Sequence, residues 1–264
     1  MKLKAVKSLG QSFLVHQATA DRLVAELELR KDETVIEIGS GKGVLTEKLV
    51  SQTGQIIAIE IDPRLANFLR NKFVGAQNLT IINRDFLQIS LSDFQNVKII
   101  GNLPFNITTA ILEKLLAHTP YWTKAVLTVQ REFAQRLLAR PGSRSYGILS
   151  VLCNYYCPAQ RLFNIPARYF KPTPKVTSTA IALEPRAVEL LPFSIFFPLV
   201  RNAFMPQPRK LLLNNLAANL KLSKKNISKI FIDSGLTINI RPEDLTAEQF
   251  AQLTKTLISS GDNY

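Results

Sequence analysis

Residues 34–46 read TVIEIGSGKGVLT, and this stretch indicates how the chain folds. The run Thr34–Ile38 is rich in β-branched residues and predicts a buried strand, whereas Val44–Gln52 has apolar residues at helical spacing. The glycines between them allow a tight turn and leave room for a ligand to pack on the main chain. The G-x-G-x-G spacing differs from the G-x-G-x-x-G of dinucleotide folds. This turn alone is a weak signal that leaves a nicotinamide-dependent oxidoreductase open.

Strands and helices continue to alternate through the first half of the chain. Further strands are predicted at Gln55–Ile59, Leu79–Ile82, Val97–Ile100, Ala125–Val129, Leu149–Tyr155 and Val176–Leu183, the last two separated by a Pro-rich connection. Helices are predicted at Pro63–Phe73 and Thr108–Leu116. Because strands that are joined by helices usually run parallel, the pattern predicts an α/β fold with a mostly parallel sheet.

From about Pro185 the pattern becomes all-helical. The expected helices cover Arg209–Leu220, a segment from a Ser223 cap to Ser234-Gly235, and a last helix that starts at the capping-box pair Thr246 and Gln249 and ends before Gly261. We therefore expect two domains, residues 1–185 and residues 186–264.

Acidic residues follow the second and third predicted strands. Glu60 and Asp62 end the stretch IAIEID, and Asp85 lies in NRDF. A carboxylate at such a strand end can accept hydrogen bonds from both ribose hydroxyls of a nucleoside, and Asp85 can accept one from an adenine amino group. A solvated charge at a strand end is the structural alternative for Glu60.

The fourth strand leads into GNLPFNI, residues 101–107. Asn102 supplies an amide oxygen, Pro104 fixes the turn so that the Leu103 or Pro104 carbonyl faces the site, and Phe105 offers a flat face. Two acceptors can take the two N6 hydrogens of an extruded adenine while its ring stacks on the aromatic side chain. In this position the segment favours a site for an extruded adenine over an oxidoreductase site.

Charge is unevenly distributed over the 264 residues, whose net charge is +13. Residues 31–120 are neutral, whereas residues 121–185 hold nine Lys and Arg against two acidic residues. A solvated basic face is one interpretation, but a neutral half followed by a basic half favours a small-molecule site joined to a polyanion-binding region.

Two cysteines and two histidines are too few for a disulfide scaffold or a closed zinc site. We expect a soluble cytoplasmic protein, because no apolar run is long enough to span a bilayer.

These motifs resemble those of the small-subunit ribosomal-RNA adenine N6,N6-dimethyltransferases. The resemblance covers KSLGQSFLVHQ, EIGSGKGVLT, IAIEID, NRDF, GNLPFNI, SYGILSVLCNYYC and FKPTPKVTSTAIALEP, nearly the whole chain. It implies a Rossmann-like class I methyltransferase fold, with a seven-stranded sheet covered by helices on both faces, and a small C-terminal helical domain. It further implies that residues 1–185 bind S-adenosylmethionine and that residues 186–264 contact RNA.

The resemblance also implies roles for individual residues of this sequence. Those expected to bind S-adenosylmethionine are Ser12, Leu14, Gly39, Glu60, Asp85 and Asn102. Those expected to hold the target base and serve catalysis are Asn102, Leu103, Pro104 and Phe105, with Phe170 stacking on the other face of the base. The expected RNA contacts are Arg131, Arg136, Arg144, Lys175, Arg209 and Lys210, and no metal is expected. The family usually has Tyr at Phe105 and Asn or His at Ser12, and its basic QRRK reads Gln207-Pro208-Arg209-Lys210 here.

The implied reaction is dimethylation of adenines near the 3′ end of 16S rRNA within an assembling small subunit, by a monomer without a membrane partner. Three alternatives stay open. One is a methyltransferase of the antibiotic-resistance type that modifies large-subunit rRNA, and another is a DNA adenine methyltransferase. The third is a ribosome-assembly factor without catalysis, against which the intact Gly39, Glu60, Asp85 and Asn102 argue.

Overall fold

The chain forms two compact units in a computed structural model that describes residues 4–6, 9–207 and 210–260. The first unit contains residues 1–134 and 159–185, and the second contains residues 135–158 and 186–264. Residues 135–158 therefore differ from the expected division, because they group with the C-terminal helices instead of with the sheet. A break at residue 185 alone does not describe the observed units.

The first unit is built on a seven-stranded sheet with the order β4-β3-β2-β5-β6-β9-β7. The strands are β2 (Thr34–Ile38), β3 (Gln55–Ile59), β4 (Leu79–Ile82), β5 (Val97–Asn102), β6 (Trp122–Gln130), β7 (Ala159–Ile165) and β9 (Ser178–Leu183). Strands β2 to β6 pair in parallel, and β9 pairs antiparallel with both β6 and β7. The mostly parallel Rossmann-like sheet is confirmed, and parallel pairing brings the carboxyl ends of β2, β3 and β5 to one edge.

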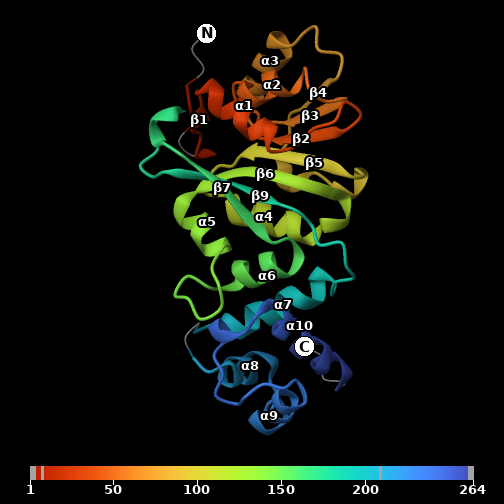
Figure 1. Cartoon of the computed structure of the whole chain (residues 1–264), viewed down its shortest axis with the longest axis vertical. Helices are drawn as coiled ribbons and strands as arrows, with labels where there is room; N and C mark the ends of the chain where they lie inside the picture. The colour runs from red at the N-terminus through yellow and green to blue at the C-terminus, as the bar shows by residue number, and fades with distance from the viewer. Residues whose placement is uncertain (1–3, 7–8, 208–209, 261–264) are drawn as a thin grey trace. The chain divides into compact units, whose positions relative to one another are not determined.

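Helices cover both faces of this sheet. Figure 1 shows α1 (Gln17–Ala25), α2 (Val44–Leu49) and α3 (Pro63–Lys72) on one side and α4 (Thr108–Ala117) on the other. Pro63 occupies the first turn of α3, where its missing N–H is tolerated, and the Asp62 carboxylate accepts from the Arg64 N–H as the N-cap. Apolar residues of α1 and α2 pack on Val35, Ile56 and Ile100 of the sheet, and this core fixes the strand ends that carry the site.

Two predicted elements were wrong. Leu149–Tyr155, expected as a strand, lies within helix α6 (Ile148–Tyr156). Nearly every residue of α6 is buried, so the run has no polar face whose spacing could reveal a helix. The Pro-rich connection contains the missing seventh strand, β7, which lies at the sheet edge between Pro158 and Pro166. Prolines are tolerated at the ends of such an edge strand.

The second unit consists of helices. It contains α6, α7 (Phe193–Phe204), α8 (Leu212–Leu220), α9 (Lys224–Asp233) and α10 (Ala247–Ser259). Ser223 caps α9, and Thr246 with Gln249 forms the expected capping box of α10. Helix α8 begins at Leu212; Arg209 and Gly261 lie outside the described residues. Among the described helices, none combines the length and the apolar composition needed to cross a membrane.

Candidate active site

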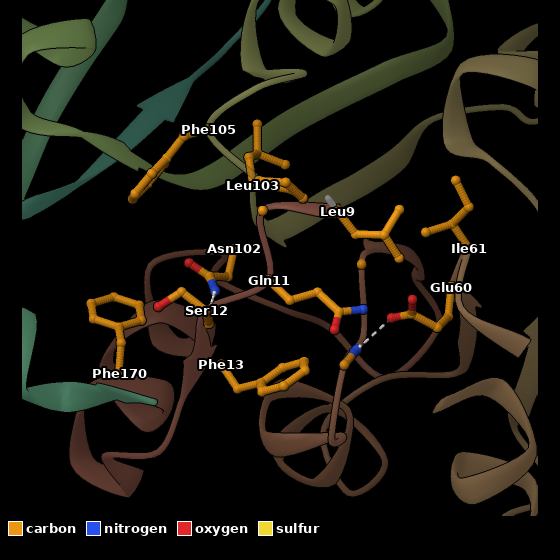
Figure 2. Close-up of a pocket in the computed structure, with 14 residues that line it drawn as sticks. Leu9, Gln11, Ser12, Phe13, Glu60, Ile61, Asn102, Leu103, Phe105 and Phe170 are labelled. Atoms are coloured by element: carbon orange, nitrogen blue, oxygen red, sulfur yellow. Dashed lines mark hydrogen bonds between the residues drawn. The ribbon is translucent and has the colours of Figure 1, made fainter. Parts of the chain in front are cut away.

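A pocket of about 590 Å³, counting the space that opens to solvent, lies at the carboxyl ends of β2, β3 and β5. Its walls are the turn after β2, Glu60 and Ile61 after β3, residues 102–105 after β5, and Phe170. Residues 9–14, here called the N-terminal segment, lie across it (Figure 2). The segment ends in β1 (Phe13–Leu14), which pairs antiparallel with β8 (Phe170–Lys171). All these residues belong to the first unit.

The turn after β2 depends on glycine. Gly39, Gly41 and Gly43 have φ angles of 70°, 57° and 75°, a region that L side chains rarely adopt. A Cβ atom on Gly39 would meet no protein atom within 4 Å, so the space beside this glycine is open to a ligand. The Gly41 N–H donates to Glu60 Oε2 at 2.8 Å, which ties the turn to β3.

Glu60 is held rigidly at the base of the pocket. Its side chain is 4% exposed, and its second oxygen, Oε1, accepts from the Asp62 N–H at 2.9 Å. Burial raises the pKa of this carboxyl above its usual value, while the two backbone N–H groups act in the opposite direction. Each oxygen keeps a lone pair free, so Glu60 can still accept hydrogen bonds from a bound ligand.

Asn102 presents its amide oxygen to the pocket. The side-chain nitrogen Nδ2 donates to the Ser12 carbonyl at 2.8 Å, which fixes the orientation of the amide. No described residue donates to the oxygen Oδ1. Figure 2 shows this oxygen beside the space that Phe105 and Phe170 flank. The main chain of Ser12, and not only its side chain, therefore contributes to the site.

The turn after Asn102 uses the Pro104 carbonyl and leaves the Leu103 carbonyl without a described donor. The Pro104 carbonyl accepts from the Ile107 N–H at 3.2 Å and from Thr108 Oγ1 at 2.9 Å. The Leu103 N–H donates to the Thr128 carbonyl at 3.1 Å, and no described group donates to the Leu103 carbonyl. Of the two carbonyls that the sequence left open, the geometry thus favours that of Leu103.

Two phenylalanines flank these acceptors. Phe105 is partly exposed and lines the pocket, as does Phe170, which is 2% exposed and also packs in the sheet core. Ser12, Gly39, Glu60 and Asn102 line the same pocket. The Ser12 hydroxyl donates to the Pro172 carbonyl at 2.8 Å, so its proton is already engaged within the chain.

Two expected cofactor residues lie outside this pocket. Leu14 lines a smaller adjoining hollow that shares Phe13, Gly39 and Asn102 with it. Asp85 caps a short 3-10 helix, where its Oδ1 accepts from the Leu87 N–H at 2.9 Å. No described residue donates to Oδ2, so Asp85 can still accept a hydrogen bond from a ligand.

Sequence reasoning missed several residues of the site, among them Ile61, Gln11, Phe13 and Glu37. Gln11 and Phe13 line the pocket from the N-terminal segment, although both stand in the quoted run KSLGQSFLVHQ. Glu37, in EIGSG, lines the adjoining hollow; it is 1% exposed and accepts from Thr46 Oγ1 at 2.6 Å. Burial raises the pKa of Glu37 to about 7, and the like charge of Glu60 adds to this effect. No local pattern distinguished these residues from core or loop residues.

The residues expected to contact RNA lie on the surface wherever the structure describes them. These are Arg131, Arg136, Arg144, Lys175 and Lys210, and Arg209 lies outside the described residues. None of the five forms an ion pair with another described residue, whereas Lys124, from the same stretch of sequence, lies 3.0 Å from Glu28 and 3.2 Å from Glu184. The excess positive charge is therefore open to solvent.

Comparison with known proteins decides the family. A model of the family described as ribosomal RNA adenine dimethylase matches residues 2–259. The chain belongs to this family. It is 37% identical to ribosomal RNA small subunit methyltransferase A of Halothermothrix orenii, over 97% of this chain and 89% of the relative. It is 36% identical to the protein of that name from Alkaliphilus metalliredigens, over 96% and 92% of the two chains.

Two solved structures of methyltransferases resemble this chain along nearly all of its length. A dimethyladenosine transferase from Plasmodium falciparum has a TM-score of 0.81 at 25% identity and covers 95% of this chain and 98% of its own. The 23S rRNA methyltransferase ErmE has a TM-score of 0.70 at 28% identity, over 93% and 99% of the two chains. The fold and the family are thus established together.

Proposed function

We propose that this chain transfers methyl groups to the N6 atom of adenines in small-subunit ribosomal RNA, twice for each adenine. The observation that carries the proposal is the pair of free acceptors, Asn102 Oδ1 and the Leu103 carbonyl, beside two phenylalanine rings and a glycine-rich pocket. Two acceptors match the two hydrogens of the adenine amino group.

The residues of this chain contribute to methyl transfer mainly by positioning the adenine N6 atom relative to the methyl donor. Asn102 and the Leu103 carbonyl accept the N6 hydrogens, which favours a pyramidal nitrogen whose lone pair is directed at the methyl donor. Phe105 and Phe170 stack on the extruded base and offset the cost of unstacking it by about 1–3 kcal/mol. The methylated nitrogen loses its proton readily, so no general base is required. The hydroxyl that Tyr would provide at Phe105 is not needed for stacking.

The pocket suits S-adenosylmethionine, which when bound supplies an electrophilic methyl group on sulfur. The open space beside Gly39 admits a ligand against the main chain, and Glu60 presents buried carboxylate oxygens to ribose hydroxyls. Ile61, which is 45% exposed at the pocket wall, offers an apolar surface to a base. Ser12, Leu14 and the free oxygen of Asp85 complete the set that would hold this cofactor.

Small-subunit RNA is the favoured substrate over large-subunit RNA. The relatives named small subunit methyltransferase A are 36–37% identical to this chain, against 28% for ErmE. By the same resemblance the adenines lie near the 3′ end of 16S rRNA, and the reaction belongs to the cytoplasm. Because phosphate contacts alone carry no sequence information, we infer that the RNA is recognised within an assembling subunit.

The unpaired cations would provide the RNA-binding surface. Arg131 and Lys175 belong to the first unit, and Arg136, Arg144 and Lys210 belong to the second, so we assign RNA binding to both. Arg209 is expected to act with its neighbour Lys210. We further propose that the chain acts as a monomer.

The deciding experiment measures methyl transfer from labelled S-adenosylmethionine to unmethylated small subunits, large subunits and duplex DNA, with the nucleosides identified by mass. We expect dimethyladenosine with small subunits only. Label in large-subunit RNA would move the chain to the resistance type of methyltransferase. Cofactor binding without transfer to any substrate would favour an assembly factor.

Substitution of Asn102 tests the site itself. Asn102→Ala should lower transfer roughly hundredfold or more, since a prepositioned polar group at the reacting atom is lost. Asn71→Ala is the matched control, because Asn71 is exposed on α3 away from the pocket lining. Equal activity of the two variants would refute the role of Asn102.

A further inference from the structure

Gln11 connects the N-terminal segment with the end of β3. Its Oε1 accepts from the Val6 N–H at 2.8 Å, and its Nε2 donates to Asp62 Oδ2 at 3.2 Å. Asp62 is 3% exposed, and its own N–H donates to Glu60. Glu60 in turn accepts from the Gly41 N–H. A continuous chain of hydrogen bonds therefore runs from the N-terminal segment to the glycine turn.

The same segment orients the opposite half of the site. The Ser12 carbonyl, one residue after Gln11, accepts from Asn102 Nδ2 and so directs the free oxygen of Asn102. Figure 2 shows the Gln11 side chain reaching across the pocket towards Glu60 and Ile61. Gln11 and Ser12 thus link the two sides of the pocket through adjacent residues.

We propose that Gln11 is a positioning residue for methyl transfer, which fixes the N-terminal segment against Asp62 and thereby places the Ser12 carbonyl that orients Asn102. This inference rests on the proposed function, because it concerns the same pocket. Gln11 needs no contact with the reacting atoms; it acts through Asp62 on one side and Ser12 on the other.

The side-chain amide suits this position because both of its ends are used. Glutamate has the same length but cannot donate a hydrogen bond when ionised, so it would place a second carboxylate about 3 Å from that of Asp62. The Arg64 guanidinium, 2.6 Å from Asp62, lowers the pKa of Asp62 to about 2. The Asp62 carboxylate, which accepts from Gln11 Nε2, therefore stays ionised at every pH at which the enzyme would be assayed.

Loss of Gln11 should loosen the segment without unfolding the unit. Residues 13 and 14 remain paired with β8, and the Val15 N–H still donates to the Tyr169 carbonyl. The freed part is then residues 9–11, which line the pocket. Ser12 keeps the bond from its hydroxyl to the Pro172 carbonyl but loses the fixed neighbour that helps to set the position of its own carbonyl. Cofactor binding should weaken and turnover should slow, whereas the thermal stability of the ligand-free protein should stay unchanged.

The test compares Gln11→Ala and Gln11→Glu with the control Gln52→Ala, whose side chain is exposed and forms no described hydrogen bond. Calorimetry with S-adenosylhomocysteine gives the Kd, and assays on unmethylated small subunits give kcat and KM for S-adenosylmethionine. For Gln11→Ala we expect Kd to rise about tenfold, the usual effect of losing a hydrogen bond to a charged group, and kcat to fall at saturating cofactor. Gln52→Ala should match the wild type.

The pH dependence of the Gln11→Glu activity gives a second test, because a merely structural role of Gln11 would not change it. The activity of this variant relative to wild type should be lower than that of Gln11→Ala at pH 8. It should recover towards pH 5.5, where the introduced carboxyl takes up a proton and can donate to Asp62. This variant also decides the matter if Gln11→Ala proves unstable.

The outcomes separate the inference from the proposed function. Wild-type protein that neither binds S-adenosylhomocysteine nor transfers methyl groups would overturn the proposed function and, with it, this inference. Active wild-type protein with Gln11 variants of unchanged Kd and kcat would overturn the inference alone. Weaker binding, a lower kcat and the recovery of Gln11→Glu at low pH would support it.

Discussion

Single residues of this site combine structural and chemical tasks. The amide nitrogen of Asn102 is fixed by Ser12 and its oxygen is left free. Glu60 accepts two backbone N–H groups and keeps lone pairs for a ligand. In both residues, the hydrogen bonds within the chain fix the geometry that substrate or cofactor binding requires.

Glu37 gives a prediction for stability against pH. Burial raises its pKa to about 7, from 4.5 in the unfolded chain. Between these pH values the native state holds a proton that the unfolded state has lost, so the free energy of unfolding falls as pH rises. The contribution is fully present below about pH 4.5 and amounts to about 3 kcal/mol, which is lost as pH passes through about 7.

Urea unfolding at pH 5 and pH 8 checks this effect. The wild type should lose about 2.5 kcal/mol more stability between these pH values than Glu37→Gln, whose amide does not titrate. The same pH dependence in both proteins would show that Glu37 is not the group responsible.

At the scale of elements, the turn between β2 and α2 is set by close packing as well as by backbone conformation. A Cβ on Gly43 would lie 2.7 Å from Phe73 Cε2 and 2.8 Å from Leu69 Cδ2, near the end of α3. Gly43 is also the left-handed N-cap of α2. Any other residue at this position would require the Phe73 and Leu69 side chains to move.

Gly43→Ala should lower the free energy of unfolding by about 2 kcal/mol, from left-handed strain and overpacking together. Gly75→Ala is the matched control, since a Cβ there would meet no protein atom within 4 Å. The control should stay within about 0.5 kcal/mol of the wild type in denaturant titrations. A Gly43→Ala protein as stable as the control would contradict the packing argument.

The elements also show where periodicity succeeds and fails. The five parallel strands and α3 were predicted because short β-branched runs alternate with segments of helical spacing. Helix α6 was mistaken for a strand because burial on all sides removes the polar face that periodicity needs. Strand β7 was missed because it is a half-exposed edge strand between prolines, stabilised by its pairing with β9 and by packing of Ile165 in the core.

At the scale of the whole molecule, the net charge differs between a neutral stretch and a basic stretch of the chain. Residues 31–120, which carry most of the pocket, have no net charge, whereas residues 121–185 are basic. Lys124 of this stretch forms ion pairs, but Arg131, Arg136, Arg144 and Lys175 form none with the described residues. Such cations can release counterions from RNA, so RNA affinity should fall steeply with salt.

The salt dependence of RNA binding tests these contacts. Arg144→Ala or Lys175→Ala should each reduce the slope of log K against log salt concentration by about 0.7–0.9, the value for one lost phosphate contact. Arg30→Ala is the control, because Arg30 is 77% exposed but lies 3.4 Å from Glu33. If all three variants changed the slope equally, net charge and not local contact would govern binding.

The sequence by itself determined the parallel sheet, the glycine turn, the position of the GNLPFNI segment at a strand end and the basic second half, because each depends on local spacing or composition. It also placed Ser12, Gly39, Glu60, Asn102, Phe105 and Phe170 in one site. Only the tertiary structure decided that Leu103 and not Pro104 offers the free carbonyl, that Ser12 orients Asn102, and that residues 135–158 join the C-terminal helices. These features depend on hydrogen bonds and packing between distant segments, and such contacts leave no periodic signal in the sequence.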